Sequence, residues 1–340
     1  MLNKIGKRKS VLKNLFALPR VCFFLLGNVY RQKRFIKEKL AKDLEPFKRR
    51  MDAGLSEKDL KKITSYYALG VPAILGESLC ILRGLPMTKN ERMCLTYLGG
   101  ISGLLDDLFD DPEKEAAHLE SFILKPEVSA SYKIHEYLLI YLYQKGLSFS
   151  PKPEKIKEQA TKVFKAQQKS EAQKLKVVSG AIIKDLTCSK GGSSFIFYRL
   201  CLEHELSREE EDLLFHLGGV MQLGNDIFDV WEDHQSQTTT AATGTKDIQT
   251  LRKFFITELE KTGELAWSTY YKKKDIEKFL QIVHLALARV FVCLDQFEKL
   301  QISTGNTFCI EKYTRKQTIC DMQKPANQLN SIKYFLQVPV

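Results

Sequence analysis

Apolar residues recur at three- and four-residue spacing along almost the whole chain, which is the spacing of one face of an α-helix. Sustained alternation of the kind found in β-strands does not occur in the sequence. Two helix starts carry capping signals, Ser56 and the Thr88/Glu91 pair. Helices are expected at about 56–83, 88–111, 126–146, 152–187, 193–204, 207–236, 248–271, 275–302 and 310–323. The sequence therefore predicts an all-α bundle.

The positive charge of the chain is concentrated at its N-terminus. Residues 1–50 hold 15 Lys and Arg against 3 acidic residues, whereas residues 51–340 hold 37 against 38. No long linker divides the 340 residues, so we expect a basic, partly apolar segment (1–50) and a single domain (51–340). No nucleic-acid partner is expected, because a nucleic-acid-binding protein would spread its basic residues over the binding face.

The basic segment also contains apolar residues such as Leu12, Phe16 and Phe23. This combination indicates peripheral contact with an anionic membrane surface, and it fits equally well a helix that packs its apolar side on the domain. No small-residue cleavage site follows, which argues against a signal peptide. No uninterrupted apolar run approaches the roughly 18–20 residues of a membrane span, so no spanning helix is expected.

The eight cysteines are scattered and form no C-x-x-C pair. In a chain of this length they indicate reduced, buried thiols and a cytoplasmic protein, which could lie at the inner face of the membrane. The six histidines are equally dispersed, so the sequence gives little support for a zinc site.

A first acidic cluster lies between Asp106 and Asp111, where Asp106/Asp110 and Asp107/Asp111 are each four residues apart. That spacing places two carboxylates on one helix face. Their mutual repulsion costs helix stability unless cations neutralise them, and carboxylate oxygens suit Mg²⁺. The alternative is an acidic helix end that faces solvent.

A second cluster lies inside an otherwise apolar helix. Asn225, Asp229 and Asp233 follow at steps of four residues, and Gln222 precedes them by about one turn. These side chains share one stripe of the helix. A carboxylate buried among apolar residues requires a partner. Two such helices facing each other would form a cage for Mg²⁺ ions and a diphosphate.

The pattern D-x-x-x-D-D followed by Q-L-x-N-x-x-x-D-V-x-E-D resembles the paired metal motifs of class I isoprenoid synthases. The second motif is similar to the squalene and phytoene synthase form. The stretch from Lys190-Gly-Gly-Ser-Ser through Gly218-Gly-Val-Met-Gln-Leu-Gly-Asn-Asp to Thr238-Thr-Thr most resembles the bacterial large-terpene synthases of the tetraprenyl-β-curcumene synthase type.

This resemblance implies an α-helical class I fold with a central cavity and three Mg²⁺ ions that hold a prenyl diphosphate. The metal ligands on one wall would be Asp106, Asp107, Asp110 and Asp111, and those on the other Asn225, Asp229 and Asp233. Lys190, before a helix break expected at Gly191-Gly192, and Arg199, Lys312 and Tyr313 are candidates for binding the diphosphate. Candidates for the pocket lining are Gly103, Phe109, Phe195, Phe228 and Gln222, although the aromatic residues among them also fit ordinary core.

Three reactions are known for such a fold. Chain elongation is disfavoured, because the basic segments that elongating synthases carry are missing. Head-to-head condensation has the closest second motif but lacks the Tyr-rich segment before it. Ionisation of one prenyl diphosphate to a cyclic or linear terpene is therefore preferred. A non-catalytic prenyl-diphosphate binder remains an alternative, and the fold family permits a homodimer.

Small residues precede both acidic clusters, at Gly99, Gly100 and Gly103 and at Gly218 and Gly219. They would leave room for a long substrate tail, of C15 or longer, with C20–C35 expected. Close helix–helix packing at these glycines explains them equally well.

Overall fold

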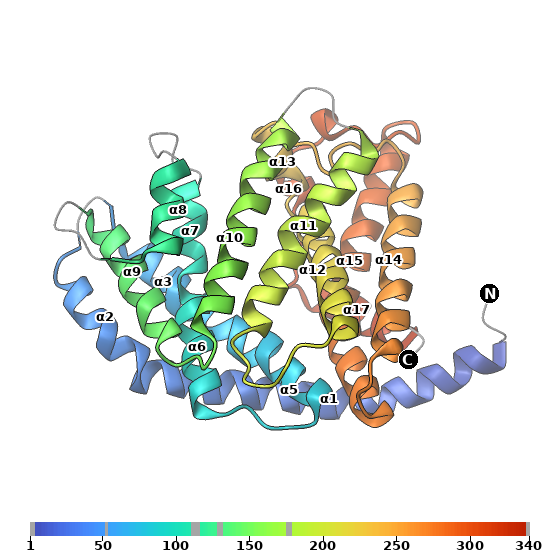
Figure 1. The fold of residues 1–340 in the computed structure, drawn as a ribbon. Helices are drawn as coiled ribbons and strands as arrows, with labels where there is room; N and C mark the ends of the chain where they lie inside the picture. The colour runs from blue at the N-terminus through green and yellow to red at the C-terminus, as the bar shows by residue number, and fades with distance from the viewer. Residues whose placement is uncertain (1–3, 52–53, 110–115, 128–131, 175–178, 338–340) are drawn as a thin grey trace. The chain divides into compact units, whose positions relative to one another are not determined.

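A computed structural model describes residues 4–51, 54–109, 116–127, 132–174 and 179–337, and within the helices it leaves undescribed the side chains of 4–10, 106–107 and 116–119. The described residues form helices and connections and contain no strand, which confirms the all-α prediction (Figure 1). The longer helices are α1 (Lys4–Glu38), α2 (Leu40–Lys48), α6 (Lys89–Gly100), α7 (Ser102–Phe109), α8 (Ala116–Leu124), α9 (Ile134–Leu147), α10 (Pro153–Ser170), α11 (Gly180–Arg199), α12 (Arg208–Phe228), α14 (Ile248–Ser268), α15 (Lys273–Ser303) and α17 (Pro325–Gln337).

Shorter helical segments connect these. They are α3 (Glu57–Lys62), η1 (Ile63–Tyr67), α4 (Ala68–Gly70), η2 (Val71–Gly76), α5 (Glu77–Arg83), η3 (Glu171–Lys174), α13 (Val230–Gln235), η4 (Ile310–Lys312) and α16 (Arg315–Thr318). The segments η1 and η2 are π-helical and interrupt the helical run Glu57–Arg83 without ending it. Ser56 and Thr88 both form the capping boxes with the third residue of their helices that such sequences favour.

The chain divides into two compact units whose segments alternate along the sequence. Unit 1 comprises Met1–Val21, Ala166–Phe195 and Ser207–Val340. Unit 2 comprises Cys22–Lys165 and Ile196–Leu206. The divisions at residues 21, 165 and 195 fall inside α1, α10 and α11, so three helices contribute to both units.

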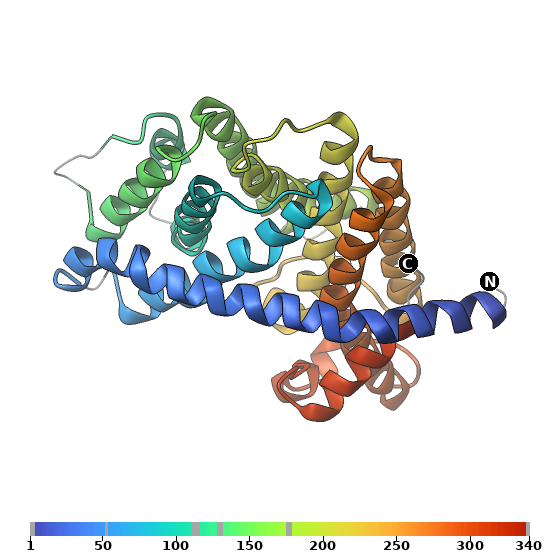
Figure 2. The same ribbon diagram turned by 90° about the horizontal axis from the view of Figure 1, so that it is seen from below.

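In unit 1, α12, α14 and α15 pack side by side, and α17 packs on α15 (Figure 1). Leu213, Phe255, Phe279 and Phe297 are fully buried between them. Burial of such apolar side chains is the main source of stability for the bundle. The amide of Asn14 donates a hydrogen bond of 3.1 Å to the carbonyl of Phe335, which ties the first helix of the chain to the last (Figure 2).

In unit 2, α6 packs against α9 and against the helical run Glu57–Arg83. Two buried ion pairs hold these elements together: Arg83 contacts Glu91 at 2.5 Å, and Arg92 binds Glu77. Glu91 also accepts a hydrogen bond of 2.8 Å from the backbone N–H of Glu203. Because each charge has a partner, these groups avoid the large cost of burying an isolated charge.

Several expected helix boundaries were wrong. The helix from 88 breaks at Ile101 into α6 and α7, and the helix expected over 152–187 ends at Ser170. The helix expected from 207 to 236 breaks at Asp229. The end expected at residue 111 for the helix from 88 lies outside the described residues.

Two described helices are long and apolar enough to cross a membrane by length and composition, Val11–Glu38 and Glu57–Arg83. The prediction that no helix spans a membrane considered only uninterrupted apolar runs, and this criterion neither confirms nor contradicts it, so it stays a prediction. Half of the most apolar window in Glu57–Arg83 is buried inside the structure. Core helices of soluble proteins pass the same test, so the finding alone does not make either helix a span.

Candidate functional site

The end of α12 presents a row of polar side chains to one pocket of unit 1. Gln222, Asp226, Asp229 and Asp233 follow at steps of four, three and four residues, which keeps them on one stripe of a helix. The helix is interrupted at Asp229, whose φ of −93° and ψ of 16° leave the helical region, and α13 restarts at Val230. The backbone N–H of Asp233 still donates to the carbonyl of Asp229 at 2.9 Å, so the stripe continues through the break.

The pocket has a volume of about 130 Å³. It is lined by polar side chains from α11, α12, α13, η3 and the connection after α13, namely Gln173, Thr187, Lys190, Gln222, Asp226, Asp229, Asp233, Thr238 and Thr240. We call it the acidic pocket. The connection is fixed to η3 by the N–H of Thr239, which donates to the carbonyl of Gln173 at 2.7 Å.

Asp226 is the most buried carboxylate of the acidic pocket, with 6% of its surface exposed. Gln222 donates to its Oδ1 at 2.8 Å, and the Thr187 hydroxyl donates to its Oδ2 at 3.3 Å. Burial raises the pKa of Asp226 to about 6, although these two hydrogen bonds and the charge of Lys190 act in the opposite direction. Asp226 therefore joins α12 to α11 as well as lining the pocket.

The other two carboxylates of the pocket also resist ionisation. Burial, followed by the negative charges of Asp226 and Asp229, raises the pKa of Asp233 to about 7. Asp229 is partly exposed, but desolvation of its carboxylate within the pocket, followed by the charge of Glu232, raises its pKa, and Arg289 and Lys190 oppose this. Negative charge is thus crowded in the pocket beyond what Lys190 neutralises, and a bound cation would relieve it.

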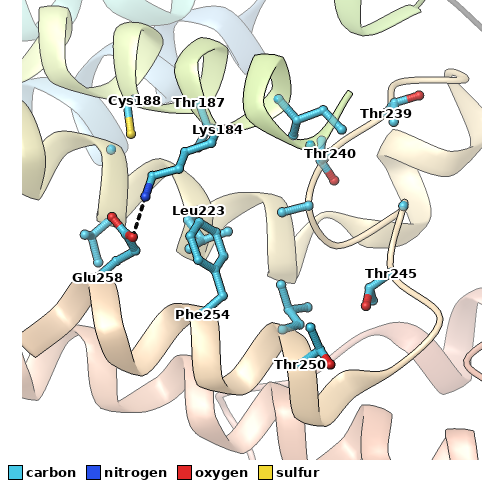
Figure 3. Close-up of a pocket in the computed structure, with 17 residues that line it drawn as sticks. Lys184, Thr187, Cys188, Leu223, Thr239, Thr240, Thr245, Thr250, Phe254 and Glu258 are labelled. Carbon is cyan, nitrogen blue, oxygen red and sulfur yellow. Dashed lines mark hydrogen bonds and ion pairs between the residues drawn. The ribbon is translucent and has the colours of Figure 1, made fainter. Parts of the chain in front are cut away.

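A larger cavity of about 440 Å³ adjoins the acidic pocket within unit 1 and shares Thr187 and Thr240 with it. Its aliphatic and aromatic lining includes Ile183, Val220, Leu223, Leu251 and Phe254. Figure 3 shows a cluster of threonines on one side of this cavity and Lys184, Cys188 and Glu258 on the other.

Lys184 is held at the edge of that cavity. Its ammonium contacts Glu258 at 2.6 Å, drawn as a dashed line in Figure 3, and lies 5.2 Å from the ring centre of Phe254. The ion pair leaves the cavity without an uncompensated charge at this edge.

The stripe in the structure differs from the expected one by a single residue. Asn225 is exposed and does not line the acidic pocket, whereas Asp226 does. Asp226 was not predicted from the sequence, because the polar residues of the second motif were grouped at steps of four residues from Asn225. The signal for it was its position four residues after Gln222 and seven before Asp233, which a helical wheel places on the same face.

Lys190 lies in the pocket, but the helix break expected beside it was wrong. Helix α11 continues through Gly191 and Gly192. A methyl group on Gly191 would lie 2.0 Å from the carbonyl oxygen of Gly218, so the glycines permit close packing of α11 on α12. The free backbone N–H groups expected at Gly191-Gly192 are therefore used inside the helix.

The other three candidates for binding the diphosphate lie outside the acidic pocket. The guanidinium of Arg199 is fully buried in unit 2 and donates to the carbonyls of His204 and Glu205 at 3.2 and 3.0 Å. The hydroxyl of buried Tyr313 lies 2.7 Å from that of Thr304. Lys312 is exposed, and none of the three candidates lines the acidic pocket.

The pocket candidates other than Gln222 line neither the acidic pocket nor the larger cavity. Phe109 packs on Phe164 at 5.3 Å between ring centres, and Phe228 lies 5.1 Å from the guanidinium of Arg289. Phe195 is half-buried near the end of α11.

The glycines before the acidic clusters do not open space for a substrate tail. A methyl group on Gly103 would meet the ring of Tyr67 at 2.9 Å, and one on Gly99 would meet the carbonyl oxygen of Tyr67 at 3.1 Å. The side of α12 is similar, because Gly218 faces Gly191. Close packing of helices thus explains these glycines. They no longer support the prediction of a long-chain substrate.

The first acidic cluster belongs to unit 2, whereas the acidic pocket belongs to unit 1. Asp106 and Asp107 lie in α7, and their side chains are outside the described part of the structure. Asp110 and Asp111 lie outside the described residues altogether.

Among the residues described, no three His, Cys, Asp or Glu side chains are grouped so that they could hold one metal ion. The carboxylates of the acidic pocket therefore line one space without converging on one point. Comparison of the sequence with family models and with curated proteins gives no match.

Proposed function

We propose that this protein is a Mg²⁺-dependent class I terpene synthase, which ionises a prenyl diphosphate with loss of diphosphate. One observation carries the proposal: the acidic pocket and the larger cavity adjoin each other and share Thr187 and Thr240. This combination suits a ligand with a compact charged head and a long apolar body. A prenyl diphosphate has that form.

The donors of the acidic pocket suit Mg²⁺, because carboxylate, amide and hydroxyl oxygens are hard ligands. Mg²⁺ keeps several waters and commonly binds one or two carboxylates together with substrate phosphates, so three converging carboxylates are not required. One or two of the carboxylates of Asp226, Asp229 and Asp233 would hold it together with the substrate phosphates. When bound, Mg²⁺ supplies electrostatic stabilisation of the departing diphosphate.

Lys190 and the cavity walls supply the remaining chemistry. The charge of Lys190 opposes the rise in the pKa values of all three carboxylates. Lys190 therefore places positive charge where an anionic head would bind. The side chains of Ile183, Leu223 and Phe254 form apolar walls that would contact the prenyl chain. Contact with apolar walls would limit the access of water to the allylic cation that ionisation leaves behind, which water would quench.

The test is diphosphate release by the purified protein with Mg²⁺ and single prenyl diphosphates from C10 to C35, with mass analysis of the extracted hydrocarbon. We expect product from one chain length and none in EDTA. Asp233→Asn should lower the rate roughly 100-fold or more, because a charge-stabilising ligand is lost. Asp212→Asn is the matched control on an exposed position of the same helix and should leave the rate unchanged.

The same assay separates the alternatives. Product that forms only from two substrates together, or with NADPH, would replace this proposal with a condensing synthase. Tight Mg²⁺-dependent binding of every substrate without turnover would replace it with a non-catalytic binder. Equal activity of the Asp233→Asn and Asp212→Asn variants would remove the acidic pocket from the mechanism.

A further inference from the structure

A basic groove of about 390 Å³ lies between the first part of α1 and the first turns of α15, both in unit 1. Four cations, one carboxylate and few other side chains line it: Lys13, Phe16, Ala17, Arg20, Lys274, Glu277, Lys278 and Gln281. It shares no lining residue with the acidic pocket or the cavity beside it. The proposed synthase reaction leaves it without a role.

The groove has an excess of positive charge after its own ion pairs are counted. Lys13 pairs with Glu277 at 3.2 Å, and Lys278 lies 3.8 Å from Asp275. Arg20 and Lys274 are exposed and have no ion-pair partner in the described part of the chain. Lys272 and Lys273, directly before Lys274, are exposed as well, so this rim attracts anions.

Exposed apolar side chains lie on the same part of α1. Phe16, which lines the groove, is 76% exposed, and Leu12, one turn earlier, is 56% exposed. The protein-facing side of this helix instead buries Asn14, bonded to the carbonyl of Phe335. Ala17 and Val21 are buried on that side as well, so Leu12 and Phe16 are large apolar groups that the helix exposes in addition to its buried face.

Aromatic residues adjoin the lysines at the start of α15. Trp267, in the last turn of α14, and Tyr270, in the connection that follows, are 41% and 65% exposed. Exposed aromatic rings next to lysines are typical of the interface between a bilayer and water.

We propose that this groove and the exposed residues Leu12 and Phe16 form a docking surface for an anionic lipid bilayer. Lipid phosphates would bind against Arg20 and Lys274, while Phe16 and Leu12 enter the boundary between headgroups and acyl chains. An isologous contact between two copies would place the same cations against each other, which disfavours a dimer through this face.

Flotation of the purified protein with vesicles tests the proposal. Binding is expected to vesicles of phosphatidylcholine with 30% phosphatidylglycerol and not to phosphatidylcholine alone. Arg20→Glu/Lys274→Glu should weaken binding by roughly tenfold or more, because the charges that attract the lipid are reversed. Phe16→Ser should leave a binding that high salt removes, because only the screened electrostatic part remains.

Matched variants control for net charge and for exposed apolar area. Lys169→Glu/Lys299→Glu reverses two exposed lysines away from the groove and should keep wild-type binding, as should Ile302→Ser. Equal binding to both vesicle types by the wild-type protein would overturn the proposal without any variant. Equal losses in the groove and control variants would also overturn it, as would a concentration-dependent dimer that Phe16→Ser abolishes while vesicle binding stays unchanged.

Discussion

Substitutions can distinguish the roles of Asp226 from the role of its neighbour Asn225. Its carboxylate is buried, accepts hydrogen bonds from Gln222 and Thr187 and lines the acidic pocket. Asn225, which the motif indicated as a ligand, is exposed outside that lining. The two residues are adjacent in one helix. A difference in turnover between their variants therefore reflects the side of the helix on which each residue lies and not its position along the chain.

We expect Asp226→Asn to lower prenyl diphosphate turnover roughly 100-fold, because the pocket loses a charged oxygen donor. Asn225→Ala should keep turnover within a few-fold of the wild-type rate. Steady-state kinetics with varied Mg²⁺ measure both variants, and thermal unfolding checks that each is folded. Loss of activity in Asn225→Ala with full activity in Asp226→Asn would return the ligand set to the one that the motif indicated.

At the scale of elements, the approach of α11 to α12 depends on glycines in both helices. Gly218 faces Gly191, and a methyl group on Gly218 would lie 2.3 Å from the carbonyl oxygen of Gly191. The atom in the way belongs to the backbone, so the helices themselves would have to separate. Since Lys190 and Gln222 flank this contact along the sequence, its geometry also sets the width of the acidic pocket.

Gly218→Ala should lower the free energy of unfolding by about 1–3 kcal/mol, because overpacking forces backbone shifts. Gly263→Ala in α14 is the control, since no atom lies within 4 Å of a methyl group there. That change should raise the free energy of unfolding by roughly 0.5–1 kcal/mol through better helix propensity. Urea denaturation measures both values, and a neutral Gly218→Ala would mean that α11 and α12 are not in close contact.

Helix boundaries that depend on residues close by in the sequence could be predicted. Boundaries that depend on packing between helices could not. Ser56 and Thr88 cap their helices as expected, because a capping box is made within four residues. The break at Asp229 has no Gly or Pro beside it, and α11 continues through two glycines that locally favour a break. In these places contacts with other helices outweigh local propensity.

The candidate site followed the same division. Lys190, Gln222, Asp229 and Asp233 line the acidic pocket, and helical spacing alone groups the last three. Arg199 and Tyr313 lie elsewhere than expected. Arg199 bonds to the carbonyl of His204, and the hydroxyl of Tyr313 lies next to that of Thr304, and only the fold brings these partners together.

At the scale of the whole molecule, each unit contains a histidine with a lowered pKa: His284 is buried in unit 1, and His204 is half-buried in unit 2. Burial, with the charges of Arg199 and Arg83, lowers the pKa of His204 in unit 2 to about 3. Burial lowers the pKa of His284 in unit 1 to about 4. Both values lie below the usual 6.5 of an unfolded chain, so the unfolded state takes up protons that the folded state refuses.

We therefore expect each histidine to lower the free energy of unfolding as the pH falls from 6.5 to about 4, by at most about 1.4 kcal/mol per pH unit. Asp233, with its raised pKa, acts in the opposite direction, so variant and wild type are compared. His284→Leu should flatten the dependence in urea titrations between pH 4 and 6.5, and His234→Gln in the half-buried control position should not. An unchanged slope in His284→Leu would show that His284 accepts a proton in the folded state.

The alternation of the two units along the chain sets an order for their completion during synthesis. Unit 2 ends at Leu206, so all of it leaves the ribosome well before the rest of unit 1 has been synthesised, and its core can close early. Unit 1 cannot, because Asn14 bonds to Phe335, 321 residues later. At roughly 5–20 residues per second, the first helix waits on the order of 16–64 seconds for its last neighbour, with Leu12 and Phe16 accessible to chaperones or lipid throughout.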